Sequence, residues 1–296
     1  MSEHKLGVPK PDDDVVNREP HVLLIGYGWV GQYMGKYFTH AHYVGSDGVI
    51  KDQTGSIVPP KDFAVYDLAI ISVPTPMNPK TGQCDVSIVD KMVDKYRDVV
   101  DNFLIKSTVE IGTTDRLALK YKVNIAMSPE YIGETLGHPL LEPRRDAFQI
   151  IGGNEEVANR IARYFEAVLH ASAPIHIVTA MEAEIIKYCE NLWITQRVDY
   201  WNDVFDMCDT FQVSYTRVRE GVVLDPRIGR THSFVYPENR GWSGKCLPKD
   251  MNALAYVMRK KGKPLTTLEH QIKKNMMKWR KKYKNKERLL PSRPLW

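Results

Sequence analysis

Long hydrophobic runs and paired cysteines are both missing from this chain of 296 residues. No apolar run approaches the roughly 18 residues of a membrane span, and the polar N-terminus holds no signal-peptide core. The four cysteines form no Cys-x-x-Cys pair, so neither a disulfide framework nor a metal site of the zinc type is suggested. We therefore expect a cytoplasmic protein in a reduced compartment, without membrane contact and with disorder over residues 1–17.

Acidic residues are scarce at the C-terminal end. From residue 259 to 296 there are fourteen Lys and Arg but only two Glu, whereas the whole chain has a net charge of +5. Apolar residues in this basic tail recur at helical spacing, namely Leu268, Ile272, Met276, Trp279 and Tyr283. They predict an amphipathic helix that docks with a solvated basic face. Binding of nucleic acid or an acidic partner is the less favoured alternative.

Glycine is concentrated in one short stretch near the front, HVLLIGYGWVGQYMGKYF, in which an apolar strand-like run precedes residues that suit a helix. Gly26, Gly28 and Gly31 have the spacing Gly-x-Gly-x-x-Gly. In a strand–turn–helix unit these glycines permit the tight turn, the approach of a pyrophosphate and close helix–strand packing, respectively. The helix N-terminus adds N–H donors and a positive dipole. The stretch predicts a dinucleotide site that includes the intervening Tyr27, Trp29 and Val30.

The next predicted strand, HYVGSDG, ends in Asp47, 21 residues after Gly26. A carboxylate at this position can accept hydrogen bonds from an adenosine ribose and would repel a 2′-phosphate, which favours NAD over NADP. Because Asp-Gly is also a turn signal, an ordinary turn aspartate is the alternative.

Two further apolar segments, DLAIISVPTP and NFLIKSTVEIGTT, predict strands that end in small polar residues. Ligands of an open parallel sheet bind at the carboxyl ends of its strands. We therefore expect the cofactor cleft to be lined by Val73, Pro74, Thr75, Ser107 and Thr108. Threonines at strand ends also serve as caps, which is the plainer explanation.

The segment AEIIKYCENLWITQRVDYWNDV predicts a long helix. Lys187 and Asn191 are four residues apart and share one face, where an amine and an amide could polarise a substrate oxygen. A solvated helix face is the alternative. Cys189 in this helix, and Cys208 beyond it, suit buried structural cysteines.

Cys246 lies in a different setting, GWSGKCLPKD, which leads through a turn into the predicted helix DMNALAYVMRK. Lys245, Lys249 and the start of a helix all favour the thiolate over the thiol. This setting predicts a nucleophile.

Seven motifs in one order resemble the UDP-glucose/GDP-mannose dehydrogenase family: GYGWVG, VPTP followed by GQCDVSIV, KSTVEIGTT, SPEYIGE, AEIIKYCENLW, DPRIG and GWSGKCLPKD. The match runs from about His21 to Asn275, and DPRIG is most similar to the UDP-glucose enzymes. The resemblance implies an NAD-dependent oxidoreductase that oxidises a primary alcohol of a nucleotide sugar twice, most simply UDP-glucose to UDP-glucuronate for polysaccharide biosynthesis.

The resemblance also implies a covalent mechanism. Cys246 would hold the aldehyde as a thiohemiacetal, and the second oxidation would leave a thioester that water cleaves. Lys187 and Asn191 would stabilise oxyanions, and Asp250 would hydrogen-bond a water or Lys187.

The remaining roles implied by the resemblance fall on SPEYIGE and on two later segments. Glu134 would be the general base for thioester hydrolysis, while Glu130 and Thr108 would position Lys187 and the water. Substrate contacts are expected from Tyr131, Ile132, Arg227, Tyr236 and Gly244.

The fold expected from these segments is α/β, a Rossmann-like parallel sheet domain followed by a helical dimerisation domain. Its predicted parts are the disordered residues 1–17, the NAD-binding domain 18–178, the helical central domain 179–262 and the basic helix and tail 263–296. The long helix is expected to join two copies into a homodimer, for which Trp193, Tyr200 and Trp201 suit the interface.

Several positions depart from the family pattern. Gly-Trp-Ser-Gly stands for the usual Gly-Phe-Gly-Gly before the cysteine, Gly133 replaces an arginine, and the interval from Asp47 to Leu68 is short. Relatives also continue into a further domain that grips the nucleotide, so weak binding of the nucleotide sugar by this chain alone is expected. Two alternatives stay open: a two-domain hydroxyacid dehydrogenase that performs one oxidation, and an NAD-binding interaction module that has lost the reaction.

Overall fold

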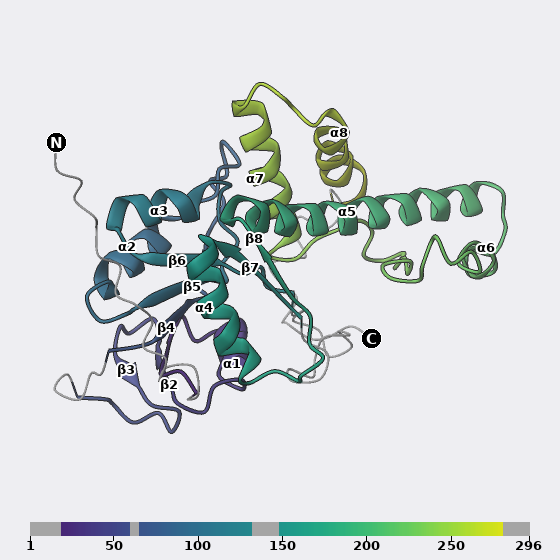
Figure 1. The fold of residues 1–296 in the computed structure, drawn as a ribbon. Coiled ribbons are helices and arrows are strands. Elements are labelled where there is room, and N and C mark those ends of the chain that lie inside the picture. Colours follow the sequence, from purple (N-terminus) through teal and green to yellow (C-terminus); the bar gives the residue numbers. More distant parts are fainter. Residues whose placement is uncertain (1–18, 60–64, 132–147, 281–296) are drawn as a thin grey trace. The chain divides into compact units, whose positions relative to one another are not determined.

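The computed structural model describes residues 19–59, 65–131 and 148–280, which form two compact units (Figure 1). The first unit comprises residues 1–73, 89–107 and 114–183, and the second comprises residues 74–88, 108–113 and 184–296. Among the described residues, none of the helices has the length and apolar character needed to span a bilayer. The predicted disordered segment 1–17 lies outside the described residues.

The first unit is built on a sheet of eight strands in the order β3-β2-β1-β4-β5-β6-β7-β8. Their bounds are β1 Val22–Ile25, β2 Ala41–Val44, β3 Ile50–Lys51, β4 Leu68–Ile71, β5 Asn102–Ile105, β6 Asn124–Met127, β7 Gln149–Gly153 and β8 Ile175–Val178. Neighbouring strands are parallel except for the β2–β3 and β6–β7 pairs. The α/β prediction is therefore confirmed.

The central strands β1, β4 and β5 are buried over their whole length. β1 and β4 are continuous apolar runs and β5 is apolar after Asn102, as expected when both faces of a parallel sheet are covered. Ile25 pairs with Ile71, and Ile71 pairs with Ile105, so the three strands end level with one another. The segments that follow these strands therefore leave the sheet at one edge.

Four helices accompany the sheet: α1 Trp29–Met34, α2 Ser87–Tyr96, α3 Thr113–Tyr121 and α4 Glu155–Glu166. Side chains of α1 and α4 share one apolar cluster, in which Phe38 and Phe165 meet edge to face at 5.5 Å. Right-handed crossovers between parallel strands put α1 and α2 on opposite faces, because the strand order reverses between β1 and β4. The reversal creates the crevice at which such sheets bind dinucleotides.

The second unit is helical and is organised along α5, Ala180–Thr210, the long helix that the sequence predicts. The other elements are α6 Tyr215–Val222, α7 Leu247–Lys260, α8 Thr266–Lys274 and the π-helical turn η3 Asn275–Trp279. Tyr188, Trp242, Met251 and Leu268 lie in one buried cluster of this unit, and Trp201 and Cys208 lie in another.

Helix α7 begins earlier than predicted. Leu247, Pro248 and Lys249 belong to its first turn, whereas the sequence suggested a separate turn before Asp250. The first helical turn tolerates proline because its N–H groups have no partner within the helix. Cys246 therefore immediately precedes the helix.

Two predictions about side chains of α5 were wrong. Trp201, expected at a dimer interface, is only 1% exposed and packs within its own unit, whereas Trp193 and Tyr200 are 59% and 49% exposed. Cys189, expected to be buried, is exposed, while Cys208 is buried. Trp201 and Cys208 lie in the cluster with Val223, to which Cys189 does not belong.

The basic tail begins as the predicted amphipathic helix, but its buried face differs. Leu268 and Trp279 are buried, whereas Met276 is 51% exposed and Asn275 is buried in its place. The cause is hydrogen bonding, because the Asn275 side-chain amide accepts from the Trp242 N–H and donates to the Trp242 carbonyl oxygen. Tyr283 lies outside the described residues.

Candidate functional site

The glycine turn that follows β1 is shaped by two close backbone approaches. Gly26 has a φ of +91°, and a Cβ on it would lie 2.5 Å from the carbonyl oxygen of Ser72 after β4. A Cβ on Gly31 would lie 2.1 Å from the oxygen of Gly26. Gly28 differs, because a Cβ there would meet no described atom within 4 Å. The open space beside Gly28 fits a dinucleotide pyrophosphate, which needs close access to the backbone.

Aromatic side chains surround this turn. The ring of Tyr27 stacks on Tyr43 of β2, with centroids 3.9 Å apart and an angle of 13° between the planes. Trp29 is 45% exposed, whereas Val30 packs against the apolar cluster beneath α1. The turn therefore presents one exposed indole and a stacked tyrosine pair beside the glycines.

Asp47 lies three residues beyond the end of β2, in the turn to β3, rather than on the strand itself. Its Oδ1 accepts from the backbone N–H of Val49 at 3.2 Å, and its Oδ2 from Lys51 Nζ at 2.6 Å. The hydrogen bond from Lys51 lowers the pKa of this exposed carboxyl. Asp47 thus stabilises its own hairpin, and its role toward a ribose stays a prediction.

Short hydrogen bonds join the ends of β1, β4 and β5 in the first unit. Ser107 Oγ donates to the carbonyl oxygen of Val73 at 2.8 Å, and Ser72 Oγ donates to that of Gly26 at 2.8 Å. Pro74, which begins the second unit, is exposed. The predicted cofactor residues Val73 and Ser107 therefore lie together at the carboxyl edge of the sheet.

A chain of polar contacts lies in the second unit. Thr75 Oγ1 donates to the carbonyl oxygen of Thr108 at 2.7 Å, and Lys249 Nζ reaches Thr75 Oγ1 at 3.4 Å and Asp250 Oδ1 at 2.5 Å. Asn191 Nδ2 donates to Asp250 Oδ2 at 2.6 Å. The structure therefore brings together four of the predicted site residues.

Asp250 is completely buried, and Asn191 is 6% exposed. A buried carboxylate is costly unless cations and hydrogen-bond donors compensate its charge, and here an ammonium and an amide contact its two oxygens. The contacts fix both the start of α7 and the amide face of α5. Lys187 lies one turn before Asn191 on α5 and is partly buried.

Cys246 and Cys84 present opposite environments for a thiol in this unit. Cys84 is 3% exposed, its Sγ lies 3.6 Å from the oxygen of Thr108, and burial raises the pKa of its thiol. Cys246 is exposed and immediately precedes α7. Gly244, with a φ of +86°, has open space where a Cβ would stand. A nucleophile needs the exposed setting of Cys246, and the buried setting of Cys84 suits a structural cysteine.

Glu130 and Tyr131 lie in the first unit, at the end of β6. Glu130 Oε2 is 3.6 Å from the ammonium of Lys106, which is buried and donates to Ser128 Oγ at 3.0 Å. The Tyr131 ring stacks on Phe148 at 4.7 Å. Lys187 belongs to the other unit, so the predicted action of Glu130 on Lys187 stays a prediction. Glu134 and Ile132 lie outside the described residues.

The two polar substrate residues predicted between α6 and α7 are exposed. The guanidinium of Arg227 pairs with Asp225 of the same loop, with Nη2–Oδ2 at 2.6 Å. Tyr236 is 46% exposed. Both side chains are accessible to a ligand, but no described contact links them to Cys246.

The contacts of two lysines with carboxylates were not predicted from the sequence. Lys249 ties Thr75 to Asp250, and Lys106 compensates Glu130 inside the first unit. Lys249 could have been found from its place beside Asp250 in PKD, since adjacent opposite charges at a helix start often pair. The burial of Lys106 follows from distant partners such as Gln149, which no local pattern reveals.

An open, mostly parallel sheet with a glycine turn after its first strand defines a dinucleotide-binding α/β protein. Residues 49–168 match the NAD binding domain, and residues 181–277 the central domain, of the UDP-glucose/GDP-mannose dehydrogenase family. The chain belongs to this family. The predicted family and the predicted cofactor, NAD, are thereby confirmed.

Curated relatives agree with this assignment. The chain is 27% identical over 227 residues to the UDP-glucose 6-dehydrogenase TuaD of Bacillus subtilis (strain 168), a match covering 73% of this chain and 48% of the relative. It is 26% identical over 226 residues to the UDP-glucose 6-dehydrogenase of Rickettsia prowazekii (strain Madrid E), covering 73% and 51%. The chain thus spans about half the length of the curated relatives it matches.

Two solved structures show the same fold. The UDP-glucose dehydrogenase of Pyrobaculum islandicum superposes with a TM-score of 0.72 at 22% identity, covering 91% of this chain and 70% of that one. The 3-hydroxyisobutyrate dehydrogenase of Mycobacterium tuberculosis superposes with a TM-score of 0.65 at 13% identity, covering 86% and 92%. At these identities the superpositions support the fold alone.

Proposed function

We propose that this protein oxidises a nucleotide sugar with NAD, most simply UDP-glucose to UDP-glucuronate, in two successive oxidations through a cysteine-bound intermediate. The observation that carries the proposal is the exposed Cys246 at the start of α7, four residues before the buried Asp250 that binds Asn191 and Lys249. Two curated relatives of the same family are named UDP-glucose 6-dehydrogenases, which supports the choice of substrate.

The proposed chemistry requires four changes at the sugar C6 atom. The alcohol loses a hydride and a proton to become an aldehyde, and the Cys246 thiolate adds to the aldehyde carbon to form a thiohemiacetal. Loss of a second hydride and a proton leaves a thioester, and water then cleaves the C–S bond to release the acid and the thiol. NAD, when bound beside the glycine turn, supplies the hydride acceptor for both oxidations.

Lys187 and Asn191 are proposed to stabilise the oxyanions of these steps. The side chain of Asn191 is oriented by the Asp250 carboxylate at 2.6 Å, so its position is set before substrate binds. Lys249 neutralises Asp250 from the other side, and the Lys187 ammonium is proposed to act on a substrate oxygen. Glu134 is proposed as the general base for thioester hydrolysis, with Glu130 and Thr108 in supporting positions.

The remaining proposals concern the substrate and the partner. Tyr131, Arg227, Tyr236 and Gly244 are proposed to contact the nucleotide sugar. A homodimer through the outer face of α5 is supported by the exposed Trp193 and Tyr200, with Trp201 no longer included. The cytoplasmic location stays a prediction.

The count of NADH formed per sugar consumed tests the function. We expect two NADH per UDP-glucose and no free aldehyde, measured by absorbance of the reduced cofactor together with an aldehyde trap. A ratio of one would favour a hydroxyacid type of reaction, which performs a single oxidation without a cysteine. No NADH with a panel of nucleotide sugars would favour an NAD-binding module without the reaction.

A further inference from the structure

The segment that carries Cys246 is fixed to α5 at both of its ends. Trp242 Nε1 donates to Asp199 Oδ1 at 3.2 Å, and Asn191 Nδ2 donates to Asp250 Oδ2 at 2.6 Å. Trp242 and Asp250 are eight positions apart, and so are Asn191 and Asp199. Because eight helical residues rise about 12 Å, the segment runs along α5 in the opposite direction, with Cys246 midway between the two anchors.

The first anchor is held a second time, by the turn η3. Asn275 Oδ1 accepts from the Trp242 backbone N–H at 3.0 Å, and Asn275 Nδ2 donates to the Trp242 carbonyl oxygen at 2.9 Å. Both residues are only 3% exposed. One side-chain amide thus satisfies both backbone groups of a buried residue, which fixes the direction in which the chain leaves Trp242.

The packing at this point leaves little freedom. A Cβ on Gly241, whose φ is +77°, would lie 2.3 Å from Asn275 Oδ1 and 2.6 Å from Trp279 Cβ. The Arg280 N–H donates to the Asn275 carbonyl oxygen at 2.8 Å, five residues apart, which is the π-helical pattern. π-Helical turns are rare and occur often at functional sites. This one brings Asn275 and Trp279 together against Gly241.

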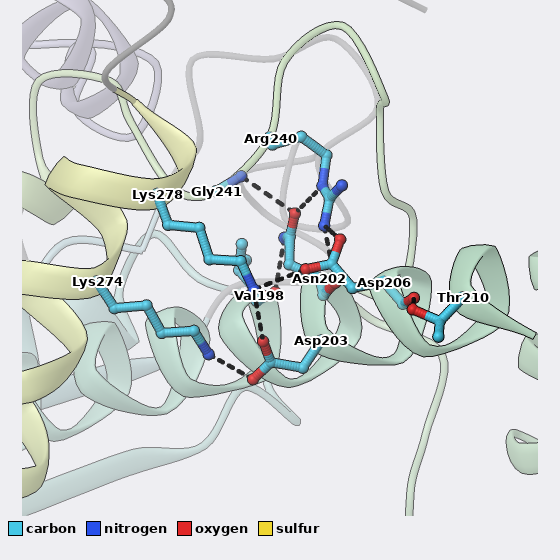
Figure 2. A network of polar contacts seen from close by, with 9 residues as sticks. All are labelled: Val198, Asn202, Asp203, Asp206, Thr210, Arg240, Gly241, Lys274 and Lys278. Atoms are coloured by element: carbon cyan, nitrogen blue, oxygen red, sulfur yellow. Dashed lines mark hydrogen bonds and ion pairs between the residues drawn. The ribbon is translucent and has the colours of Figure 1, made fainter.

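A network of charges holds α8 and η3 on α5 (Figure 2). Arg240 donates to Asn202 Oδ1 at 2.6 Å and to Asp206 Oδ1 at 2.8 Å, while Lys278 pairs with Asp206 at 2.7 Å. The guanidinium of Arg240 also lies 4.4 Å from the centre of the Trp279 ring. The segment before Cys246 is therefore clamped between two helical elements.

We propose that Asn275 is a positioning residue for the Cys246 thiol and acts through Trp242. The inference rests on the proposed function, in which Cys246 is the nucleophile. Asp250 holds the helical end of the segment and Asn275 the other end, so the thiol stays at the start of α7 and near Lys249. This proposal gives residues 266–280 a function, although they belong neither to the glycine turn nor to the polar contacts around Asp250.

The test compares Asn275→Ala with two controls on the same helix. Lys273→Ala changes an exposed neighbour, and Leu268→Ala removes a buried side chain of the cluster that contains Trp242 but none of the hydrogen bonds to Trp242. All variants are made in the full chain with Cys189→Ser, which removes the other exposed cysteine. The rate of alkylation of Cys246 by iodoacetamide at neutral pH is followed by mass spectrometry, beside the melting temperature, the NAD affinity and kcat for UDP-glucose.

We expect Asn275→Ala to slow alkylation of Cys246 at least fivefold. Cys246 is already exposed, so a looser segment gains little access but loses the helix start and the cation that favour the thiolate. kcat should fall tenfold or more with NAD affinity unchanged. Alkylation in Lys273→Ala should match the parent, and Leu268→Ala should melt earlier without the same slowing.

An alkylation rate in Asn275→Ala that equals or exceeds that of Lys273→Ala would overturn the proposal. So would an equal slowing in Leu268→Ala at a similar melting temperature, because the effect would then be general loosening. If Asn275→Ala does not fold, Asn275→Asp decides, since it keeps the acceptor for Trp242 N–H and loses the donor: a partial slowing supports the role, and none contradicts it. If the parent oxidises no nucleotide sugar, the proposed function fails, whereas the alkylation comparison still measures the position of the thiol.

Discussion

The glycine turn and the segment that carries Cys246 are built in opposite ways. The turn is shaped by backbone atoms within residues 26–31 and by Ser72, and its side chains contribute little. The cysteine segment is held by side chains from Asn191, Asp199 and Asn275, which are 59, 43 and 33 residues away from the groups they bond. We therefore expect substitutions to disrupt the two sites in different ways. The glycine turn should be disrupted by steric clashes, and the cysteine segment by the loss of single polar groups.

The largest effect is expected at the thiol. Cys246→Ser should slow the overall oxidation by about three orders of magnitude or more, since a serine hydroxyl is a far weaker nucleophile at neutral pH. NAD affinity should not change, because the glycine turn is untouched. Initial rates of NADH formation and titration of NAD measure the two quantities, with Cys189→Ser, the other exposed cysteine, as control. Full activity of the Cys246 variant would remove the thioester proposal.

A pair of glycine substitutions separates packing from ligand contact in the turn. Gly31→Ala would put a Cβ 2.1 Å from a backbone oxygen, so we expect a loss of about 3 kcal/mol in the free energy of unfolding. Gly28→Ala meets no described atom within 4 Å and should change stability by less than about 0.5 kcal/mol. The Gly28 variant should nevertheless bind NAD at least tenfold more weakly. Urea unfolding and NAD titration are the measurements, and normal NAD affinity would show that the pyrophosphate does not approach Gly28.

The same contrast explains how much of the fold could be predicted. The strand, the three glycines and the helix lie within a few residues of one another, so their spacing alone predicts the turn. The level ends of β1, β4 and β5 follow from parallel pairing of apolar runs. Asp47 shows the limit even here, because β2 ends earlier and Lys51 and Val49 bind the carboxylate.

Side chains of the helical unit were harder to predict. The helical spacing of apolar residues does not show whether Met276 or Asn275 is buried, since both lie near one face of the helix. Asn275 is buried because it bonds the backbone of Trp242, 33 residues away. Trp201 and Trp193 are equally apolar, yet only the first faces Val223 and the cluster around it. Such choices depend on distant contacts that a local pattern does not contain.

Asp199 offers a test of the polar anchors through pH. Burial raises the pKa of its carboxyl to about 6, with Lys274 acting in the opposite direction, and its Oδ2 has no hydrogen-bond partner among the described residues. The pKa is higher in the folded than in the unfolded chain. The contribution of Asp199 to stability is therefore fully present below about pH 4 and is lost as the pH rises through about 6.

Asp199→Asn should accordingly raise the free energy of unfolding at pH 7.5 by about 1–3 kcal/mol, since one pKa unit corresponds to about 1.4 kcal/mol. The gain should largely disappear near pH 4, where the natural side chain is protonated in the folded protein and about half protonated in the unfolded chain. Asp209→Asn, which changes an exposed carboxylate near the end of α5, is the control and should show no such gain at pH 7.5. Urea unfolding at the two pH values measures the difference, and a gain of equal size at both would mean that folding does not raise the pKa of Asp199.

The smallest effect is expected at Asp47 and Lys51. They lie in and beside the turn between β2 and β3, which is held by side-chain hydrogen bonds. Both oxygens of Asp47 already accept hydrogen bonds, and its side chain is 46% exposed. A ribose would have to share or replace these donors, so the net gain should correspond to about one ordinary hydrogen bond. Asp47→Ala should then weaken NAD binding about threefold to tenfold.

Lys51→Ala should change NAD affinity by less than threefold, because it removes a competing donor without removing the acceptor. Titration of both variants and the parent with NAD at one ionic strength measures these ratios. Equal NAD affinity in the parent and Asp47→Ala would return Asp47 to the role of a turn residue and would leave the glycine turn as a site made by backbone alone.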